Sequence, residues 1–528
     1  MSELKIPKIN KESTDEEGLA DNNCDLTETL TNLDEERNGV SSEASEASSV
    51  VSYDEKLYTL DENGEIEVKI EQGEDIDFKS ISNFRKWVIV VIISFTSFDI
   101  TLLSSCWSMI EGKVMEEFHV GHEVATLGIS LYIWALGVGP MFLGPISEYH
   151  GRKTVYVFST FLSLCFQLLT AFSKNLGGML FGRLISAFFG SAFMSVASGT
   201  ISDVFEIDQL GLPMAIYSVT PFMAPSLGPL ISGFVADSNA DYRWVFYSIL
   251  IFTGFLMVAI VLFVPETYVP ILLTRKAQAV RKKTGDSRFY APQEKNPLTL
   301  YQSVILSSKR PMLLILKDPM ILTLDIYSGL ILAIVYLFFV SFPYTFKTVW
   351  GFGLWAQGLS FSGLFTGMVL SLGFQPIFNK LYRQSIANNN NVAKPEFRFP
   401  ILMFGGIILP FSLFIMAWVC YSDLHWIGMI IVSGIYDIGT CVAFTGIFTY
   451  TVQAYKLYAA SAVASNSFVR SLMAGAFPLF GLQMYEALGV HWATMLIAFT
   501  ALALAPVPFL FYKYGEKLRA RSPYAWSD

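Results

Sequence analysis

The chain has 528 residues, of which 53% are hydrophobic and only 15% are charged. A soluble domain of this size could not bury so much apolar surface behind so few charges, so the composition indicates a membrane protein. The formal net charge of −9 is unevenly spread, because residues 1–80 hold 23 Asp or Glu against 7 Lys or Arg and the rest is net positive. Since the acidic segment would repel phosphates, nucleic-acid binding is disfavoured.

The five cysteines show no spacing typical of a disulfide framework or a zinc site, so we expect no metal and no other cofactor. The sequence holds no nucleophile triad and no phosphate-binding loop, and an enzyme is therefore not expected.

Residues 1–82 are rich in Glu, Asp, Ser, Thr and Asn and poor in aromatic residues. Such a segment cannot bury enough apolar area to offset the entropy of ordering, so we predict a disordered acidic tail. Its Ser and Thr residues beside acids are candidate targets of protein kinases. The alternative is a solvated tail with no specific role.

Twelve apolar runs follow the tail, each close to the 20 or so residues that a helix needs to cross a bilayer. They are residues 87–107, 124–146, 154–173, 177–204, 212–236, 243–264, 321–343, 355–378, 399–419, 425–450, 459–484 and 492–512. A polar loop over 265–320 separates an N-terminal half, 83–264, from a C-terminal half, 321–512, and a short tail, 513–528, ends the chain. We predict an all-α membrane protein with twelve transmembrane helices in two six-helix halves.

The lysines and arginines predict the orientation of the chain. With the N-terminal tail inside, the inner segments after residue 80 hold 23 basic residues and the outer loops hold 4. Cytoplasmic loops keep positive charge, so both termini and the central loop are expected in the cytoplasm.

The loop after the second run reads GPISEYHGRK, residues 144–153. Gly144 and Gly151 permit close helix approach and a tight turn, while Glu148, Arg152 and Lys153 can bridge helix ends. The pattern resembles the signature between helices 2 and 3 of major facilitator transporters, where it acts as a gating motif. The alternative is a positively charged loop that only sets the topology.

The fifth run contains APSLGPLISG, residues 224–233, in which a proline bends the helix and small neighbours allow tight packing. With Gly228, Pro229 and Gly233 it is similar to the Gly-Pro motif of facilitator-type proton antiporters. Further segments, PETYVPILLTRKA, KRPMLLILKDP, YLFFVSFPYTF, PEFRFP and the stretch 458–485, extend the resemblance. Together they resemble the fungal multidrug and polyamine branch of the superfamily, the twelve-spanner drug:proton antiporters.

Charged groups at membrane depth are costly, so each is a candidate functional residue. Asp99 and Arg183 lie about 18 and 21 Å above the inner boundary at 1.5 Å per residue, level with each other. The resemblance places both on helices that line the central cavity and implies a role in proton coupling or substrate binding. The alternative is a structural ion pair between helices.

A second polar set belongs to the C-terminal half. Asp437 and Arg470 lie at similar depths and could pair, and Asn466 shares a helix face with Arg470. We expect proton coupling or substrate binding here also, and the alternative is a polar seam between two helices.

Two further acids have other expected roles. The resemblance implies that Asp203 joins Glu148 and Arg152 in an inner charge cluster that holds the outward-facing state. Asp325 is interpreted as a cap at the start of the seventh helix, where a carboxylate suits the helix dipole.

Aromatic rings are expected in the cavity because they bind cations and apolar ligands. The candidates by position are Tyr132, Phe189, Tyr217, Phe222 and Tyr436.

The resemblance implies a monomeric, multi-pass protein of the fungal plasma membrane. It would export hydrophobic or cationic small molecules, including drugs and polyamines, by alternating access and in exchange for protons. Two alternatives remain: a proton-coupled importer of polyamines or other small cations, and a nutrient sensor that signals through the tail without net transport.

Overall fold

The computed structural model describes residues 58–60, 65–69, 78–206, 209–295, 299–390 and 392–525. Its internal contacts divide the chain into two units. One unit combines Met1–Asp77 with Leu273–Lys295, and the other combines Phe78–Leu272 with Asn296–Asp528. The second unit is a helical bundle that contains all the long apolar helices of the described chain.

The N-terminal half of the bundle contains the first six predicted runs, each within a helix or a pair of helices. These are α1 (Asn83–Ser105) with its extension α2 (Trp107–Phe118), α3 (His122–His150), α4 (Arg152–Phe172), α5 (Leu176–Gly190) with α6 (Ala192–Val204), α7 (Gly211–Asp237) and α8 (Trp244–Phe263). The fourth run is divided between α5 and α6 at Ser191. The prolines of α7 lie within an unbroken helix.

The C-terminal half is more segmented. It comprises α11 (Pro319–Trp350), the series α12 (Leu354–Leu359), α13 (Ser362–Ser371), η2 (Leu372–Phe374) and α14 (Gln375–Asn388), then η3 (Pro395–Arg398) with α15 (Phe399–Val419), α16 (Ile427–Ala454), η4 (Lys456–Tyr458), α17 (Ala459–Leu504) and α18 (Val507–Arg521). The series from α12 to α14 makes one span, so a single predicted run corresponds to several short helices.

Within the described residues, 11 helical stretches are long and apolar enough to cross a membrane, and the last of them covers 63 residues from Ala459 to Arg521. This stretch holds two spans, because Gly489 interrupts α17 with φ 77° and ψ 159°. The hydroxyl groups of Tyr485 and Thr494 lie 3.2 Å apart across the break, as expected for two arms of a hairpin. The prediction of twelve spans in two halves is confirmed.

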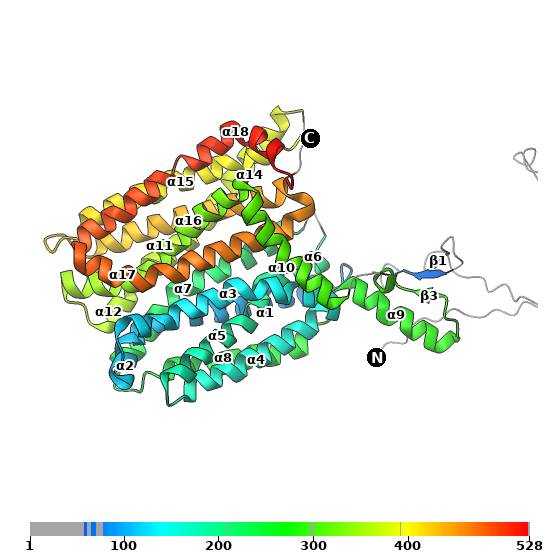
Figure 1. Ribbon diagram of the computed structural model, residues 1–528, viewed down its shortest axis with the longest axis horizontal. Coiled ribbons are helices and arrows are strands. Elements are labelled where there is room, and N and C mark those ends of the chain that lie inside the picture. Colours follow the sequence, from blue (N-terminus) through cyan, green and yellow to red (C-terminus); the bar gives the residue numbers. More distant parts are fainter. Residues whose placement is uncertain are drawn as a thin grey trace, which may run out of the picture. The chain divides into compact units, whose positions relative to one another are not determined.

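The two halves pack against each other along two helix pairs. Figure 1 shows the N-terminal helices, blue to blue-green, on one side of the bundle and the C-terminal helices, yellow-green to red, on the other. On α3, Trp134 Nε1 donates a hydrogen bond of 3.1 Å to the Leu472 carbonyl of α17. The second pair is α7 with α12, which contact each other through glycines.

The central segment between the halves is largely helical. It contains α9 (Val269–Thr284), η1 (Pro292–Lys295) and α10 (Leu300–Lys317). The N-terminus of α10 has a capping box, in which Thr299 accepts from the backbone of Gln302 and the Gln302 side chain accepts in return. Ser308 on α10 donates to the Met141 carbonyl of α3 at 3.5 Å, so α10 packs on the bundle.

The other unit contains a three-stranded sheet in the order β1-β2-β3. Strand β1 (Tyr58–Leu60) pairs antiparallel with β2 (Ile66–Val68), and β2 pairs parallel with β3 (Phe289–Tyr290) from the central segment. The expectation of disorder over 1–82 is therefore wrong for these two strands. The alternation in IEV places Ile66 and Val68 on one face, where they pack in a small core with Ala277, Val280, Phe289 and Ala291. The Ser-rich stretch 41–52 lies outside the described residues.

Candidate functional site

The predicted gating motif forms a tight turn. Helix α3 ends at His150, Gly151 has φ +98°, and α4 begins at Arg152. A Cβ on Gly151 would collide with the carboxylate of Glu266, so glycine is required by both the backbone angle and the space. Glu266 accepts from the backbone N–H groups of Arg152 and Lys153, at 2.7 and 3.1 Å, and thereby caps the N-terminus of α4.

Arg152 connects three elements at this end of the bundle. Its Nε lies 3.4 Å from Asp203 Oδ2 on α6, its Nη1 donates to Ser147 Oγ at 2.9 Å, and its guanidinium lies 4.7 Å from the Tyr268 ring centroid. The structure thus brings together Arg152 and Asp203, as predicted. Burial raises the pKa of Tyr268, and the charge of Glu148 adds to that rise.

The remaining predicted member of the gating motif points elsewhere. Lys153 Nζ donates to the Val261 carbonyl near the end of α8, at 3.1 Å, where a cation suits the helix dipole. Gly144 lies in α3 near Ser195. Sequence reasoning missed Glu266, although an acid directly after an apolar run that ends at Val264 is a usable signal.

The Gly-Pro motif on α7 makes close helix contacts. A Cβ on Gly228 would lie 2.9 Å from the Cys106 nitrogen and 3.0 Å from the Leu102 carbonyl oxygen, so α7 packs directly on α1. A Cβ on Gly233 would lie 2.9 Å from the Leu354 carbonyl oxygen of α12. A Cβ on Gly358 would collide with the Pro229 carbonyl. The motif therefore joins the two halves at the end of α7 remote from the Arg152 cluster.

Arg183 is fully buried and is held by backbone oxygens rather than by an acid. Its Nε donates to the Gly128 carbonyl at 2.7 Å and its Nη2 to the Leu103 carbonyl at 3.1 Å. The guanidinium lies 4.7 Å from the ring centroid of Trp107 and 4.8 Å from that of Tyr132. The carbonyl at the C-terminal end of α1, the carbonyl from α3 and the two rings together compensate the buried charge.

Asp99 has a different environment, so the structure does not support the alternative interpretation of an ion pair with Arg183. Thr253 of α8 donates to Asp99 Oδ2 at 2.6 Å, and Gln167 lies beside the same hydroxyl at 3.0 Å. The other carboxylate oxygen, Oδ1, is buried with no hydrogen-bond partner. Equal depth does not bring two residues together, because Asp99 faces α8 whereas Arg183 reaches the last turn of α1.

Asp325 is not a helix cap. The N-cap of α11 is Asp318, whose side chain accepts from the Met320 backbone N–H at 3.0 Å. Asp325 lies within the helix, fully buried, and accepts from Asn466 Nδ2 at 3.0 Å. Asn466 also donates to Ser328 Oγ at 2.6 Å. The apolar run starts at 321 in the sequence, but the helix begins at Pro319, and this shift explains the error.

Asp437 and Arg470, which the sequence allows to pair, do not form a pair in the structure. Both oxygens of Asp437 are buried without a hydrogen-bond partner, and so are Nε and Nη1 of Arg470. The guanidinium of Arg470 lies among three rings instead, 5.6, 5.4 and 5.3 Å from the centroids of Phe222, Phe444 and Phe448.

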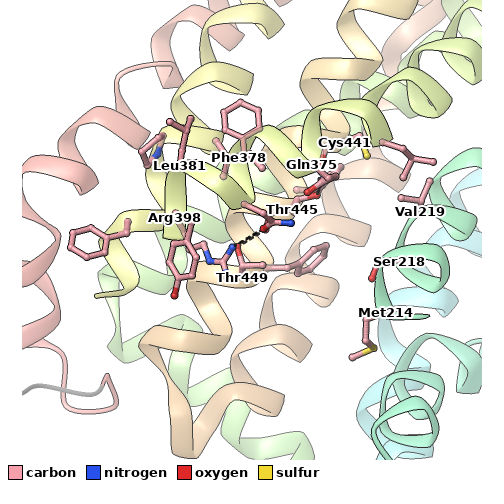
Figure 2. A pocket seen from close by; sticks show the side chains of 18 of the residues that line it. Met214, Ser218, Val219, Gln375, Phe378, Leu381, Arg398, Cys441, Thr445 and Thr449 are labelled. Atoms are coloured by element: carbon pink, nitrogen blue, oxygen red, sulfur yellow. Dashed lines mark hydrogen bonds between the residues drawn. The ribbon is translucent and has the colours of Figure 1, made fainter. Parts of the chain in front are cut away.

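A cavity of about 300 Å³ lies between α7 and the C-terminal half. Figure 2 shows Met214, Ser218 and Val219 of α7 across this cavity from Arg398. The lining residues come from four parts of the chain: Met214, Ser218, Val219 and Phe222; Leu372, Gln375, Phe378, Asn379, Leu381 and Tyr382; Phe397, Arg398, Pro400 and Ile401; Cys441, Phe444, Thr445, Phe448 and Thr449.

Phe222 alone among the five predicted aromatic residues lines this cavity, where its ring stacks on Phe444 at 4.9 Å. The hydroxyl groups of Tyr132, Tyr217 and Tyr436 donate to the carbonyls of Ile100, Phe193 and Ile331, so these rings join helices. The ring of Phe189 packs against Phe158 and Phe188. Buried tyrosines need a hydrogen-bond partner, and a neighbouring helix supplies it.

The arrangement suits proton binding more than metal binding. Among the residues that the structure describes, no group of three His, Cys, Asp or Glu could hold a metal ion. Asp99, Asp325 and Asp437 each have at least one buried oxygen without a partner. An ionised carboxylate is costly in such a place, and a proton removes that cost.

Comparison with known proteins gives consistent matches. The family model described as the Major Facilitator Superfamily matches residues 88–478. The "Probable drug/proton antiporter YHK8" of Saccharomyces cerevisiae is 48% identical over 461 residues, which cover 87% of this chain and 89% of the relative. The "Efflux pump atB" of Aspergillus terreus is 40% identical, with 85% of this chain and 87% of the relative covered.

Solved structures support the fold. The crystal structure of a D-xylose-proton symporter matches with a TM-score of 0.58 and 13% identity, covering 81% of this chain and 97% of that chain. The inward open xylose transporter XylE from E. coli matches with a TM-score of 0.59 and 10% identity, covering 81% of this chain and 96% of that chain. At this identity the likeness concerns the fold alone.

Proposed function

The chain belongs to the Major Facilitator Superfamily, and on that premise we propose that it is a proton-coupled exporter of small, largely apolar organic molecules. Its relatives include proteins named as a probable drug/proton antiporter and as efflux pumps. Those relatives and the buried carboxylates together support proton-coupled export by a multi-pass membrane protein.

Asp437 is the observation that carries the proposal. It is fully buried on α16, both of its oxygens lack a partner, and it lies one helical turn before the cavity-lining Cys441. A carboxylate in this position is stable when protonated and unstable when ionised, unless the cavity opens and water or substrate reaches it. We assign the proton that drives export to Asp437.

Alternating access requires contacts at both ends of the bundle that can open in turn. The cluster of Arg152, Asp203 and Glu266 lies at one end, which the positive charge of the loops assigns to the cytoplasm. The contact of Gly233 with α12 lies towards the other end. We propose that the Arg152 cluster opens and closes the cytoplasmic side of the bundle. The contact of Gly233 with α12 opens and closes the outer side.

The proposal places the protein in the plasma membrane as a monomer with both termini in the cytoplasm. Kinase action on the N-terminal tail stays a prediction from the sequence, as do import of small cations and signalling without transport.

The experiment is expression of the full chain in a yeast strain that lacks its own exporters. The accumulation of a labelled panel of acids, neutral compounds and cations is measured with and without a proton uncoupler. We expect lower accumulation of at least one compound and recovery when the uncoupler is added. A higher, uncoupler-sensitive accumulation would indicate an importer, and no change for any compound at full expression would contradict transport.

A further inference from the structure

We propose that the cavity between α7, α14, α15 and α16 binds a small aromatic organic anion, such as an arene carboxylate, in preference to a cation of the same size. The inference rests on the proposed export function for its physiological meaning, because it names the class of substrate. The binding preference itself can be measured without transport.

The size and walls of the cavity suit a compound of one or two rings. A volume of about 300 Å³ is at the lower end of small-molecule sites. The rings of Phe222 and Phe444 stack at 4.9 Å with an interplanar angle of 22°, so they present nearly parallel flat surfaces to the cavity. An aromatic ligand can extend such a stack.

The cavity has positive charge and no negative charge in its lining. Arg398 is its single charged residue, since none of the described lining residues is Asp, Glu or Lys. The Arg398 guanidinium lies 3.5 Å from the Tyr382 ring centroid, and its Nη1 reaches Asn379 Oδ1 only at 3.5 Å. Its Nε is buried with no hydrogen-bond partner. The Nε–H group of this cation can therefore donate to a ligand carboxylate.

Arg470 adds a second cation behind the aromatic wall. It lies 5.3–5.6 Å from the centroids of Phe222, Phe444 and Phe448, three rings that also line the cavity. Two of its nitrogens, Nε and Nη1, have no hydrogen-bond partner. Positive charge in a low-dielectric wall attracts an anion and opposes a cation.

No acid among the described residues forms an ion pair with Arg398, and two of the acids near the two arginines have other partners. Glu396, two residues before Arg398, is held by Arg519, whose Nε and Nη2 lie 3.1 and 3.4 Å from its oxygens. Asp325 is bound by Asn466, and its charge also acts on Arg470. Asp437 lies one turn beyond the lining and has no ion-pair partner among the described residues. A ligand carboxylate would therefore supply the counter-charge that Arg398 lacks.

The test is binding of three matched probes to the purified full-length protein in nanodiscs. The probes are 1-naphthoate, neutral 1-naphthamide and cationic 1-naphthylmethylammonium, and the dissociation constants are measured by radioligand binding at pH 7. We expect naphthoate to bind at least about tenfold more tightly than the ammonium compound, as one charge-assisted hydrogen bond would give. Equal or tighter binding of the cation would overturn the proposal without any variant.

A pair of variants locates the effect. Arg398→Gln should weaken naphthoate binding about tenfold or more and leave the amide within about twofold, while Arg398→Lys should keep most of the preference for the acid. The control is Arg383→Gln, which removes the same charge from an exposed position on α14. Retained naphthoate affinity in Arg398→Gln, with amide binding confirming a folded site, would overturn the assignment. If the protein binds naphthoate more tightly than the ammonium compound but shows no uncoupler-sensitive export, the result would instead contradict the proposed function.

Discussion

At the scale of single residues, depth along a helix was predictable from the sequence but direction was not. Counting residues puts Asp99 and Arg183 at similar depths, yet Asp99 accepts from Thr253, whereas Arg183 donates to one carbonyl of α3 and one at the end of α1. A rise of 1.5 Å per residue gives height, whereas the partner depends on how each helix is rotated in the bundle. For the same reason Asn466 meets Asp325 and not Asp437.

Because their environments differ, we expect Asp99→Asn and Arg183→Lys to have additive effects on the free energy of unfolding. Because the two side chains share no hydrogen bond or ion pair among the described contacts, the double variant should lose the sum of the single losses within about 0.5 kcal/mol. Thermal or denaturant unfolding of the purified protein in detergent measures the free energies. A coupling above about 1 kcal/mol would show that the two charges interact after all.

Glu111 lies on α2, outside the predicted span 87–107, and we expect it to make the stability of the folded state depend on pH. Burial raises the pKa of Glu111 from 4.5 to about 7, although Thr126 donates to it at 2.5 Å. The folded state therefore favours the protonated form, and its contribution, present below about pH 4.5, is lost as the pH rises through about 7.

Glu111→Gln should abolish that loss. The melting temperature of the variant should match the parent near pH 5 and exceed it at pH 8, by an amount corresponding to at most about 3 kcal/mol. The control is Glu116→Gln, an exposed change on the same helix. Parallel pH profiles of the Glu111 variant and the parent would contradict a buried, protonated Glu111.

At the scale of elements, hydropathy predicts the membrane spans, and local motifs predict the turns between them. The glycine at 151 was assigned to a tight turn, and its φ of +98° agrees. The cap of α11 was misplaced by seven residues, although Asp-Pro at 318–319 is itself a helix-start signal. The series from α12 to α14 could not be foreseen, because an apolar run does not reveal where a helix breaks.

Gly358→Ala tests the contact between α7 and α12. The added methyl group would collide with the Pro229 carbonyl, which is backbone and cannot turn aside. We expect a destabilisation of about 1–3 kcal/mol and greater labelling of a cysteine placed at Ser360. Gly373→Ala is the control, since a Cβ there meets nothing within 4 Å. Equal stability of the two variants would show that the contact between α7 and α12 does not hold the outer side closed.

At the scale of the whole molecule, the two six-helix halves follow from composition and run lengths, but the pairing of tail and central segment does not. Three-residue strands such as β1 and β2 carry too little pattern to be found within an acidic sequence. The strand β3, which pairs with β2, lies more than 200 residues away in the sequence, and local propensity does not predict such a distant contact. The cavity between the halves likewise depends on how they pack.

The most direct test of the account is proton-driven transport in proteoliposomes by the parent chain, Asp437→Asn and the exposed control Asp423→Asn. Uptake of whichever of the three naphthalene probes moves fastest is measured with an imposed pH gradient, and exchange of the same probe is measured without one. We predict that Asp437→Asn loses gradient-driven accumulation and keeps exchange, because the neutral amide cannot release a proton, while Asp423→Asn behaves as the parent. Accumulation by Asp437→Asn equal to the parent at matched protein amounts would contradict the assignment of the driving proton to Asp437.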